Sequence, residues 1–121
     1  VNKFENQTDI SVEFQVRGEQ ETLPSSYEVT VFRLIQEGLN NIYKHAQANE
    51  ARVYLEYAEE YLNILIADNG RGFKVNDISD DKFGLISMKE RCDLIGGEIE
   101  IDSKKNKGTK IKINISLMEE E

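Results

Sequence analysis

Hydrophobic and polar residues alternate along short stretches of the chain, a period that predicts β-strands. Four such stretches are residues 10–16, 51–57, 98–102 and 108–117. A fifth predicted strand, residues 61–67 and third in chain order, is almost continuously apolar, as expected of a buried strand. Polar turns at residues 58–60 and 103–107 connect the second strand to the third and the fourth to the fifth. Each of these two pairs is therefore predicted to form a hairpin.

Two other stretches have a helical period. In residues 27–48, apolar side chains recur at intervals of three and four, which places them on one helix face. They are Val31, Leu34, Ile35, Gly38, Leu39 and Ile42. Residues 85–95 repeat this spacing, and Gly96 and Gly97 are expected to end that second helix. Hairpins and helices in this order predict an α/β two-layer sandwich, with a mixed, mostly antiparallel sheet and helices packed on one face.

A polar line runs along the first predicted helix. Glu37, Asn41 and Lys44 are spaced four and three residues apart, so they lie on one side of the helix. Their line is about 100° from the centre of the apolar face, at the edge of the core. A carboxylate, an amide and an ammonium group there suit a ligand made of phosphates and a metal ion. The alternative is an ordinary polar border, in which a Glu–Lys attraction contributes roughly 0.2–0.5 kcal/mol.

The segment at residues 68–73 has the sequence Asp-Asn-Gly-Arg-Gly-Phe and directly follows the predicted buried strand. Asp68 therefore stands at the end of a rigid element, where its carboxylate can accept hydrogen bonds from a ligand's amino group. Gly70 and Gly72 allow the backbone to turn sharply and to approach a flat ligand closely. The alternative is a simple Asx-type turn, for which Asp-Asn-Gly is also well suited.

Composition narrows the possible functions. A chain of 121 residues with 39% hydrophobic and 31% charged residues fits one globular domain, residues 1–121, with an acidic tail at residues 118–121. Its net charge of -8 argues against a nucleic-acid or anionic-membrane surface. The single Cys92 excludes an internal disulfide and fits a reducing, cytoplasmic location. The single His45 excludes a histidine metal cage and a Ser-His-Asp triad within this chain.

Four separate sequence blocks, in order and in register over residues 27–117, resemble the catalytic domain of sensor histidine kinases. Residues 33–46 resemble the asparagine box, and residues 68–73 resemble the first glycine box. The remaining matches are Phe83, Gly84, Leu85, Met88, Glu90 and Arg91 for the second glycine box, followed by Gly96, Gly97, Ser103, Gly108 and Thr109. Gln36-Glu37 and Lys44-His45 resemble the DesK-like subfamily, whose kinases signal to NarL-type response regulators.

This resemblance implies the Bergerat ATP-binding fold, which is shared with gyrase, the ninety-kilodalton heat-shock chaperone and the mismatch-repair ATPases. It also implies a set of ATP-binding residues: Asn41, Lys44, Asp68, Gly70, Gly72, Phe73, Gly84, Leu85, Gly108 and Thr109. At the adenine end, Asp68 would accept the amino group of the base, and Gly70 and Gly72 would let the base lie against the backbone. Thr109 would support the adenine.

At the phosphate end, the resemblance makes Asn41 the ligand of Mg²⁺ and Lys44 a point charge beside the phosphates. Backbone amides near Gly84 and Leu85, at a helix start, would bind phosphate oxygens. Residues 74–82 would form a short nucleotide lid. Arg71 and Arg91 would either reach the phosphates or brace that lid.

Glu37 departs from the more common kinase pattern, which has Asn at this position. It is the candidate catalytic residue, because a carboxylate there can orient water or the acceptor histidine. The resemblance also implies a separate histidine-bearing dimerisation domain as the phosphate acceptor. This chain would then be a monomeric catalytic piece of a homodimeric kinase.

In the full-length protein this domain would be the cytoplasmic portion of a membrane-anchored sensor, with no nucleic-acid ligand and no direct contact with the membrane. Its cofactors would be ATP and Mg²⁺, and its partners would be the histidine-bearing domain and a NarL-type response regulator. Two alternatives stay open at this point. One is an anti-sigma-factor type of serine kinase from the same superfamily, and the other is a non-catalytic domain that senses nucleotide or docks a partner.

Overall fold

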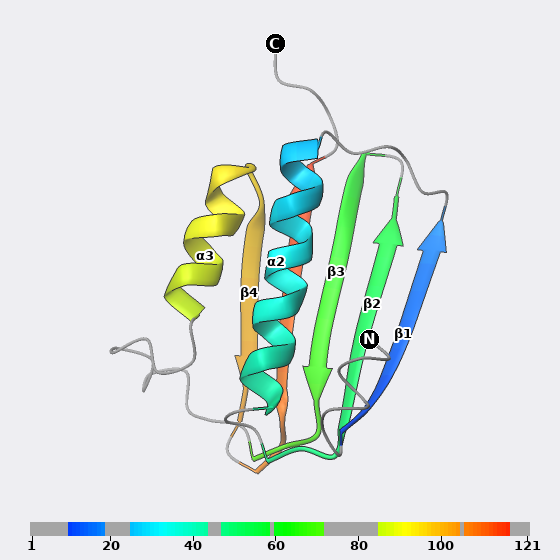
Figure 1. Cartoon of the computed structure of the whole chain (residues 1–121), viewed down its shortest axis with the longest axis vertical. Coiled ribbons are helices and arrows are strands. Elements are labelled where there is room, and N and C mark those ends of the chain that lie inside the picture. The colour runs from blue at the N-terminus through cyan, green and yellow to red at the C-terminus, as the bar shows by residue number, and fades with distance from the viewer. Residues whose placement is uncertain are drawn as a thin grey trace.

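The computed structural model describes residues 10–18, 25–43, 47–58, 60–71, 85–104 and 106–116. In chain order its elements are β1 (Ser11–Gly18), α2 (Ser25–Asn41), β2 (Glu50–Tyr57), β3 (Tyr61–Asp68), α3 (Leu85–Leu94), β4 (Glu98–Ser103) and β5 (Thr109–Ser116). The strands form one sheet, and both helices cover the same face of it (Figure 1). The predicted α/β fold with helices on one face is therefore confirmed. No helix within the described ranges is long and apolar enough to cross a membrane.

The sheet has the strand order β1-β2-β3-β5-β4. β2 pairs with β3, β3 with β5, and β4 with β5, each time antiparallel. Only the edge strand β1 pairs in parallel, along β2. Both predicted hairpins, β2–β3 and β4–β5, are confirmed, as is the mixed and mostly antiparallel character of the sheet.

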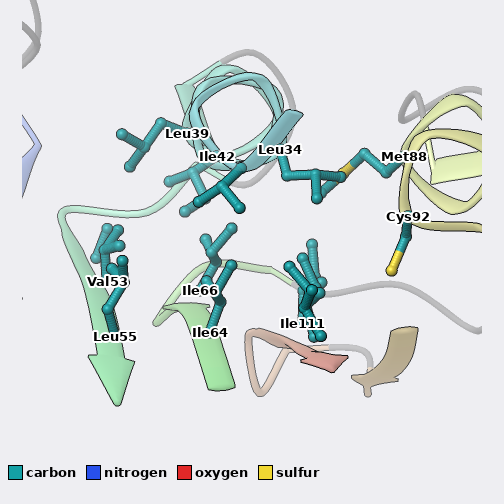
Figure 2. Close-up of a cluster of buried hydrophobic side chains, with 14 of the residues drawn as sticks. Leu34, Leu39, Ile42, Val53, Leu55, Ile64, Ile66, Met88, Cys92 and Ile111 are labelled. Carbon is teal, nitrogen blue, oxygen red and sulfur yellow. The ribbon is translucent and has the colours of Figure 1, made fainter. Parts of the chain in front are cut away.

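The core lies between the two helices and the sheet. Leu39 and Ile42 of α2 lie over the sheet near Val53 and Ile66, and Leu34 points toward Met88 of α3 (Figure 2). The side chains with almost no exposed surface are Leu34, Val53, Leu62, Ile64, Ile66, Met88, Cys92, Ile113 and Ile115. Because burial of one such side chain contributes about 1.5–3 kcal/mol, this cluster fixes the helices on the sheet.

α3 begins and ends where its sequence pattern predicts. Leu85, Met88 and Cys92 are buried, as their spacing requires. At its end Gly96 has φ of +69°, and the N–H of Gly97 donates to the carbonyl of Cys92 at 2.9 Å. A left-handed glycine with such a backward hydrogen bond satisfies the last carbonyl groups of a helix.

α2 is shorter than the sequence predicts. The helical pattern extends to residue 48, but the α-helix ends at Asn41, and Ile42 and Tyr43 form a wider, π-type turn. Gln47 and Ala48 are not helical, and Gln47 has φ of +52°. The prediction was wrong here because the chain must reverse to enter β2 at Glu50, and this tertiary requirement overrides helix propensity.

Candidate functional site

Segments from three of the four sequence blocks meet at one end of the molecule. The last residues of α2, β3 and β4 and the first residues of β5 lie at this end (Figure 1). The first turn of α3 starts farther from it and is connected to it through Met88, which accepts a hydrogen bond from Asn41. This end therefore contains Asn41, Asp68 and Thr109, which terminate or begin these elements. The strand order explains the meeting, because β3 and β5 are neighbours although about 40 residues separate their paired ends, Asp68 and Thr109.

Asp68 is a half-buried carboxylate at the end of β3. The backbone N–H of Gly70 donates to Oδ1 of Asp68 at 2.8 Å, and the backbone N–H of Thr109 donates to the same carboxylate. Burial raises the pKa of the Asp68 carboxyl above its ordinary value, while these two hydrogen bonds lower it in part. A carboxylate has about four acceptor positions. Asp68 is thus fixed by the backbone while positions remain for a ligand's donor.

Two glycines of the predicted ATP-binding set, Gly70 and Gly108, are described, and both are buried. Gly70 provides the N–H that orients Asp68, and Gly108 has φ of +82°, in the region that favours glycine. Gly108 directly precedes Thr109, the register partner of Asp68. The two glycines therefore bring backbone from the ends of β3 and β5 against one carboxylate.

Asn69 has a structural role that the sequence reasoning missed. Its Oδ1 accepts hydrogen bonds from the backbone N–H groups of Asn49 and Glu50, at 3.2 and 3.1 Å. Its Nδ2 donates to Oδ1 of Asn49 at 2.7 Å. The side chain of Asn69 thereby connects the end of β3 to the start of β2. An Asn after a strand signals side-chain bonding to backbone, but it does not reveal which backbone.

Asn41 and Glu37 lie half-buried on α2, as predicted for the edge of the core. The amide Nδ2 of Asn41 donates to Sδ of Met88 on α3, at 3.9 Å. This contact uses the nitrogen of the amide and leaves its oxygen to act as a ligand. In the part of the chain that the structure describes, no three His, Cys, Asp or Glu side chains form a metal site. An amide oxygen suits a hard cation such as Mg²⁺, which completes its coordination shell with phosphate oxygens and water.

At the start of α3, the side chain of Leu85 is buried in the core. Leu85 can therefore contribute to a site only through its backbone, and the first N–H groups of a helix, which have no acceptor within the helix, can bind an anion. On the same helix, Nε of Arg91 is buried and has no hydrogen-bond partner among the described residues. A buried donor of this kind is stabilised by any acceptor that reaches it.

Several predicted site residues lie outside the described part of the chain. They are Lys44, Gly72, Phe73 and Gly84, together with the predicted lid at residues 74–82 and with His45. Their assignments stay predictions.

Comparisons with known proteins identify the family to which this chain belongs. Residues 26–119 match the family described as histidine kinase-, DNA gyrase B- and HSP90-like ATPase. The chain is 40% identical over 121 residues to the signal transduction histidine-protein kinase/phosphatase DegS of Brevibacillus brevis, of which it covers 31%. It is 32% identical over 121 residues to the sensor histidine kinase LiaS of Bacillus subtilis, of which it covers 33%. The chain thus spans about a third of the length of these curated relatives.

Solved structures give the same fold. The blue-light activated histidine kinase of Erythrobacter litoralis EL346 superposes with a TM-score of 0.76 at 21% identity, over 96% of this chain and 39% of that protein. The histidine kinase AdeS of Acinetobacter baumannii superposes with a TM-score of 0.77 at 14% identity, over 98% of this chain and 59% of that one. By its sequence match and its fold, the chain belongs to the histidine kinase-, DNA gyrase B- and HSP90-like ATPase family.

Proposed function

We propose that this chain is the ATP-binding catalytic domain of a two-component sensor histidine kinase. It binds Mg-ATP and presents the γ-phosphate to a histidine on a separate dimerisation domain. The observation that carries this proposal is the half-buried Asp68 carboxylate, fixed by the backbone N–H groups of Gly70 and Thr109. A fixed acceptor beside glycine backbone is suited to the amino edge of adenine.

The phosphate end of the proposed site begins with Asn41. Because Nδ2 of Asn41 contacts Sδ of Met88, its Oδ1 is the atom that would ligate Mg²⁺. Bound Mg²⁺ would neutralise part of the phosphate charge. Lys44 would add a point charge, and the backbone amides at Gly84 and Leu85 would bind phosphate oxygens at the start of α3. Phe73 and Gly72 would complete the wall of the site.

Glu37 is the proposed catalytic residue. It precedes Asn41 by one helical turn and is half-buried on the same side of α2. In this position its carboxylate would orient the incoming imidazole, or accept its proton, while the γ-phosphoryl group leaves ADP and bonds to the ring nitrogen. Transfer of this kind depends mainly on positioning and charge stabilisation.

The proposed partners are supported by the names of the relatives, which are sensor histidine kinases, and by the third of their length that this chain spans. The remaining two thirds of such a protein would contain the acceptor histidine, form the homodimer and anchor the sensor, with this domain in the cytoplasm. The phosphoryl group would then pass to a NarL-type response regulator. We include residues 1–121 in one domain, with residues 118–121 as an acidic tail.

The test mixes this domain with γ-labelled ATP, Mg²⁺ and the separately purified histidine-bearing domain of the same kinase. We expect label on the partner that is lost in acid and kept in base, because phosphohistidine is acid-labile. Asp68→Asn is the matched control and should transfer little label at low ATP concentration. Acid-stable label would instead indicate a serine kinase. Absence of any nucleotide binding would indicate a domain that only docks, and either result would overturn the proposal.

A further inference from the structure

Three strands bring polar side chains into one row at the site end of the sheet. Asp68 of β3 pairs with Thr109 of β5, and Thr109 pairs with Ser103 of β4. The row lies on the helix-covered face, because Ile66 and Ile111, two residues away along β3 and β5, are buried beneath α2 (Figure 2). Ser103 is only 7% exposed and is the one buried polar side chain that the described residues contain.

Two contacts of the Ser103 hydroxyl are compatible with a donor role for its neighbour Thr109. It donates to the carbonyl oxygen of Gly108 at 3.3 Å, and its oxygen lies 2.8 Å from Oγ1 of Thr109. A serine has one hydroxyl proton, and a carbonyl can only accept. When Ser103 gives its proton to Gly108, the proton in the shorter contact must come from Thr109.

A threonine that donates to Ser103 presents only lone pairs to its other side. Its neighbour Asp68 is also an acceptor when ionised. Within this row of described residues, the side chains of Asp68 and Thr109 therefore both offer acceptors to a ligand. A 6-amino group such as that of adenine supplies protons to such acceptors, whereas a 6-oxo group would meet them with its own lone pairs.

We propose that Ser103 is a positioning residue that makes the site select 6-aminopurine over 6-oxopurine nucleotides, by holding the hydroxyl proton of Thr109. This inference rests on the proposed function, which places the base beside Asp68. It assigns to Ser103 no contact with the nucleotide. Its effect is exerted through the hydroxyl of Thr109.

The test compares ATP with inosine triphosphate, which carries a 6-oxo group in place of the 6-amino group. Dissociation constants for both are measured by calorimetry on the wild type, Ser103→Ala and Ser103→Thr. We expect the wild type to prefer ATP by about a hundredfold, and Ser103→Ala to reduce that ratio about tenfold, because the freed Thr109 hydroxyl can rotate and donate. Ser103→Thr keeps a hydroxyl and should restore the ratio to within about threefold of wild type.

A second pair of variants separates positioning from a general structural effect. Thr109→Val removes the hydroxyl through which Ser103 acts, so adding Ser103→Ala in that background should leave the nucleotide ratio unchanged. A change in that background would overturn the inference. An unchanged ratio of ATP to inosine triphosphate affinity in Ser103→Ala alone would also overturn it, whether the two affinities fall together or stay the same. In either case, measurable binding of ATP would leave the proposed function intact. If the wild type binds no ATP, the proposed function fails, and this inference fails with it.

Discussion

Gly108 lies directly against the backbone of Asp68. A Cβ atom on Gly108 would stand 2.1 Å from the carbonyl oxygen of Asp68 and 3.3 Å from Cα of Asn69. No side chain fits in that space, and φ of Gly108 is +82°. The closeness lets β5 begin beside the carboxyl end of β3, where Thr109 donates its N–H to Asp68.

Gly108→Ala should therefore destabilise the domain and weaken ATP binding. The chain offers a matched control in Gly96, which has φ of +69°. A Cβ atom on Gly96 would have no atom of the described residues within 4 Å, apart from those of its chain neighbours.

Gly96→Ala should cost about 1–2 kcal/mol of unfolding free energy, from the left-handed backbone alone. Gly108→Ala adds the clash and should cost about 2–5 kcal/mol. Urea unfolding measures both values. Equal losses in the two variants would mean that β5 relaxes away from Asp68 at little cost.

Asp68→Asn should weaken ATP binding by roughly 10- to 100-fold, because a buried donor–acceptor mismatch costs about 1–3 kcal/mol. The ligand-free variant should nevertheless be at least as stable as the wild type at pH 7. Burial raises the folded-state pKa of Asp68 above 3.8, so its contribution to stability is fully present below pH 3.8 and is lost as pH rises through the folded-state pKa. The asparagine has no charge to desolvate.

The pH dependence checks this reasoning separately from the affinity. The difference in unfolding free energy between Asp68→Asn and the wild type should shrink as pH falls through the folded-state pKa of Asp68 toward 3.8. The reason is that only the wild type has a titratable group at position 68. Comparing the two proteins cancels the other carboxylates. A difference that grows on acidification would contradict burial as the main influence on Asp68.

Asn41→Ala should weaken Mg-ATP binding about tenfold or more, and should change the affinity for ATP in excess EDTA by less than about threefold. Asn40→Ala is the matched control, because Asn40 is the exposed neighbour on α2 and undergoes the same change in side chain. Calorimetry with and without Mg²⁺ measures both. Equal losses under the two conditions would show that Asn41 only stabilises the contact between α2 and α3.

Glu37→Gln should leave ATP affinity within about threefold of wild type and lower the rate of transfer to the histidine-bearing domain by about 10²–10⁴-fold. Glu28→Gln, at an exposed residue in the first turn of the same helix, is the control and should change neither. Affinity and single-turnover rate are measured on the same preparations. A transfer rate equal to that of the wild type would end the catalytic assignment.

The sequence predicts most of this fold because its periods are regular. The alternation in β2 and the spacing of Leu85, Met88 and Cys92 in α3 each define one buried face, and both elements form where expected. The end of α2 could not be predicted in the same way, because no glycine or proline marks Asn41 as its last residue. The helix ends there because the following chain must return to β2.

The sequence indicates candidate site residues but not how they are connected in space. Asp68 and Thr109 are recognisable as parts of separate blocks, yet nothing in either block states that β3 and β5 are neighbours. The hydrogen bonds of Asn69 and Ser103 were missed although both residues adjoin predicted hairpins, because strand pairing does not state which groups a side chain reaches.

The position of β3 in the sheet has a consequence for how the nucleotide enters and leaves. β3 is the central strand and is paired along its length with β2 and β5. Amide hydrogens in such a strand exchange with solvent only when the whole domain unfolds, whereas those of the edge strand β1 are released by smaller openings. Asp68 terminates this doubly paired strand. In the proposed site the acceptor for the base would therefore be held by the central strand, and we expect nucleotide exchange to depend on motion of segments other than β3.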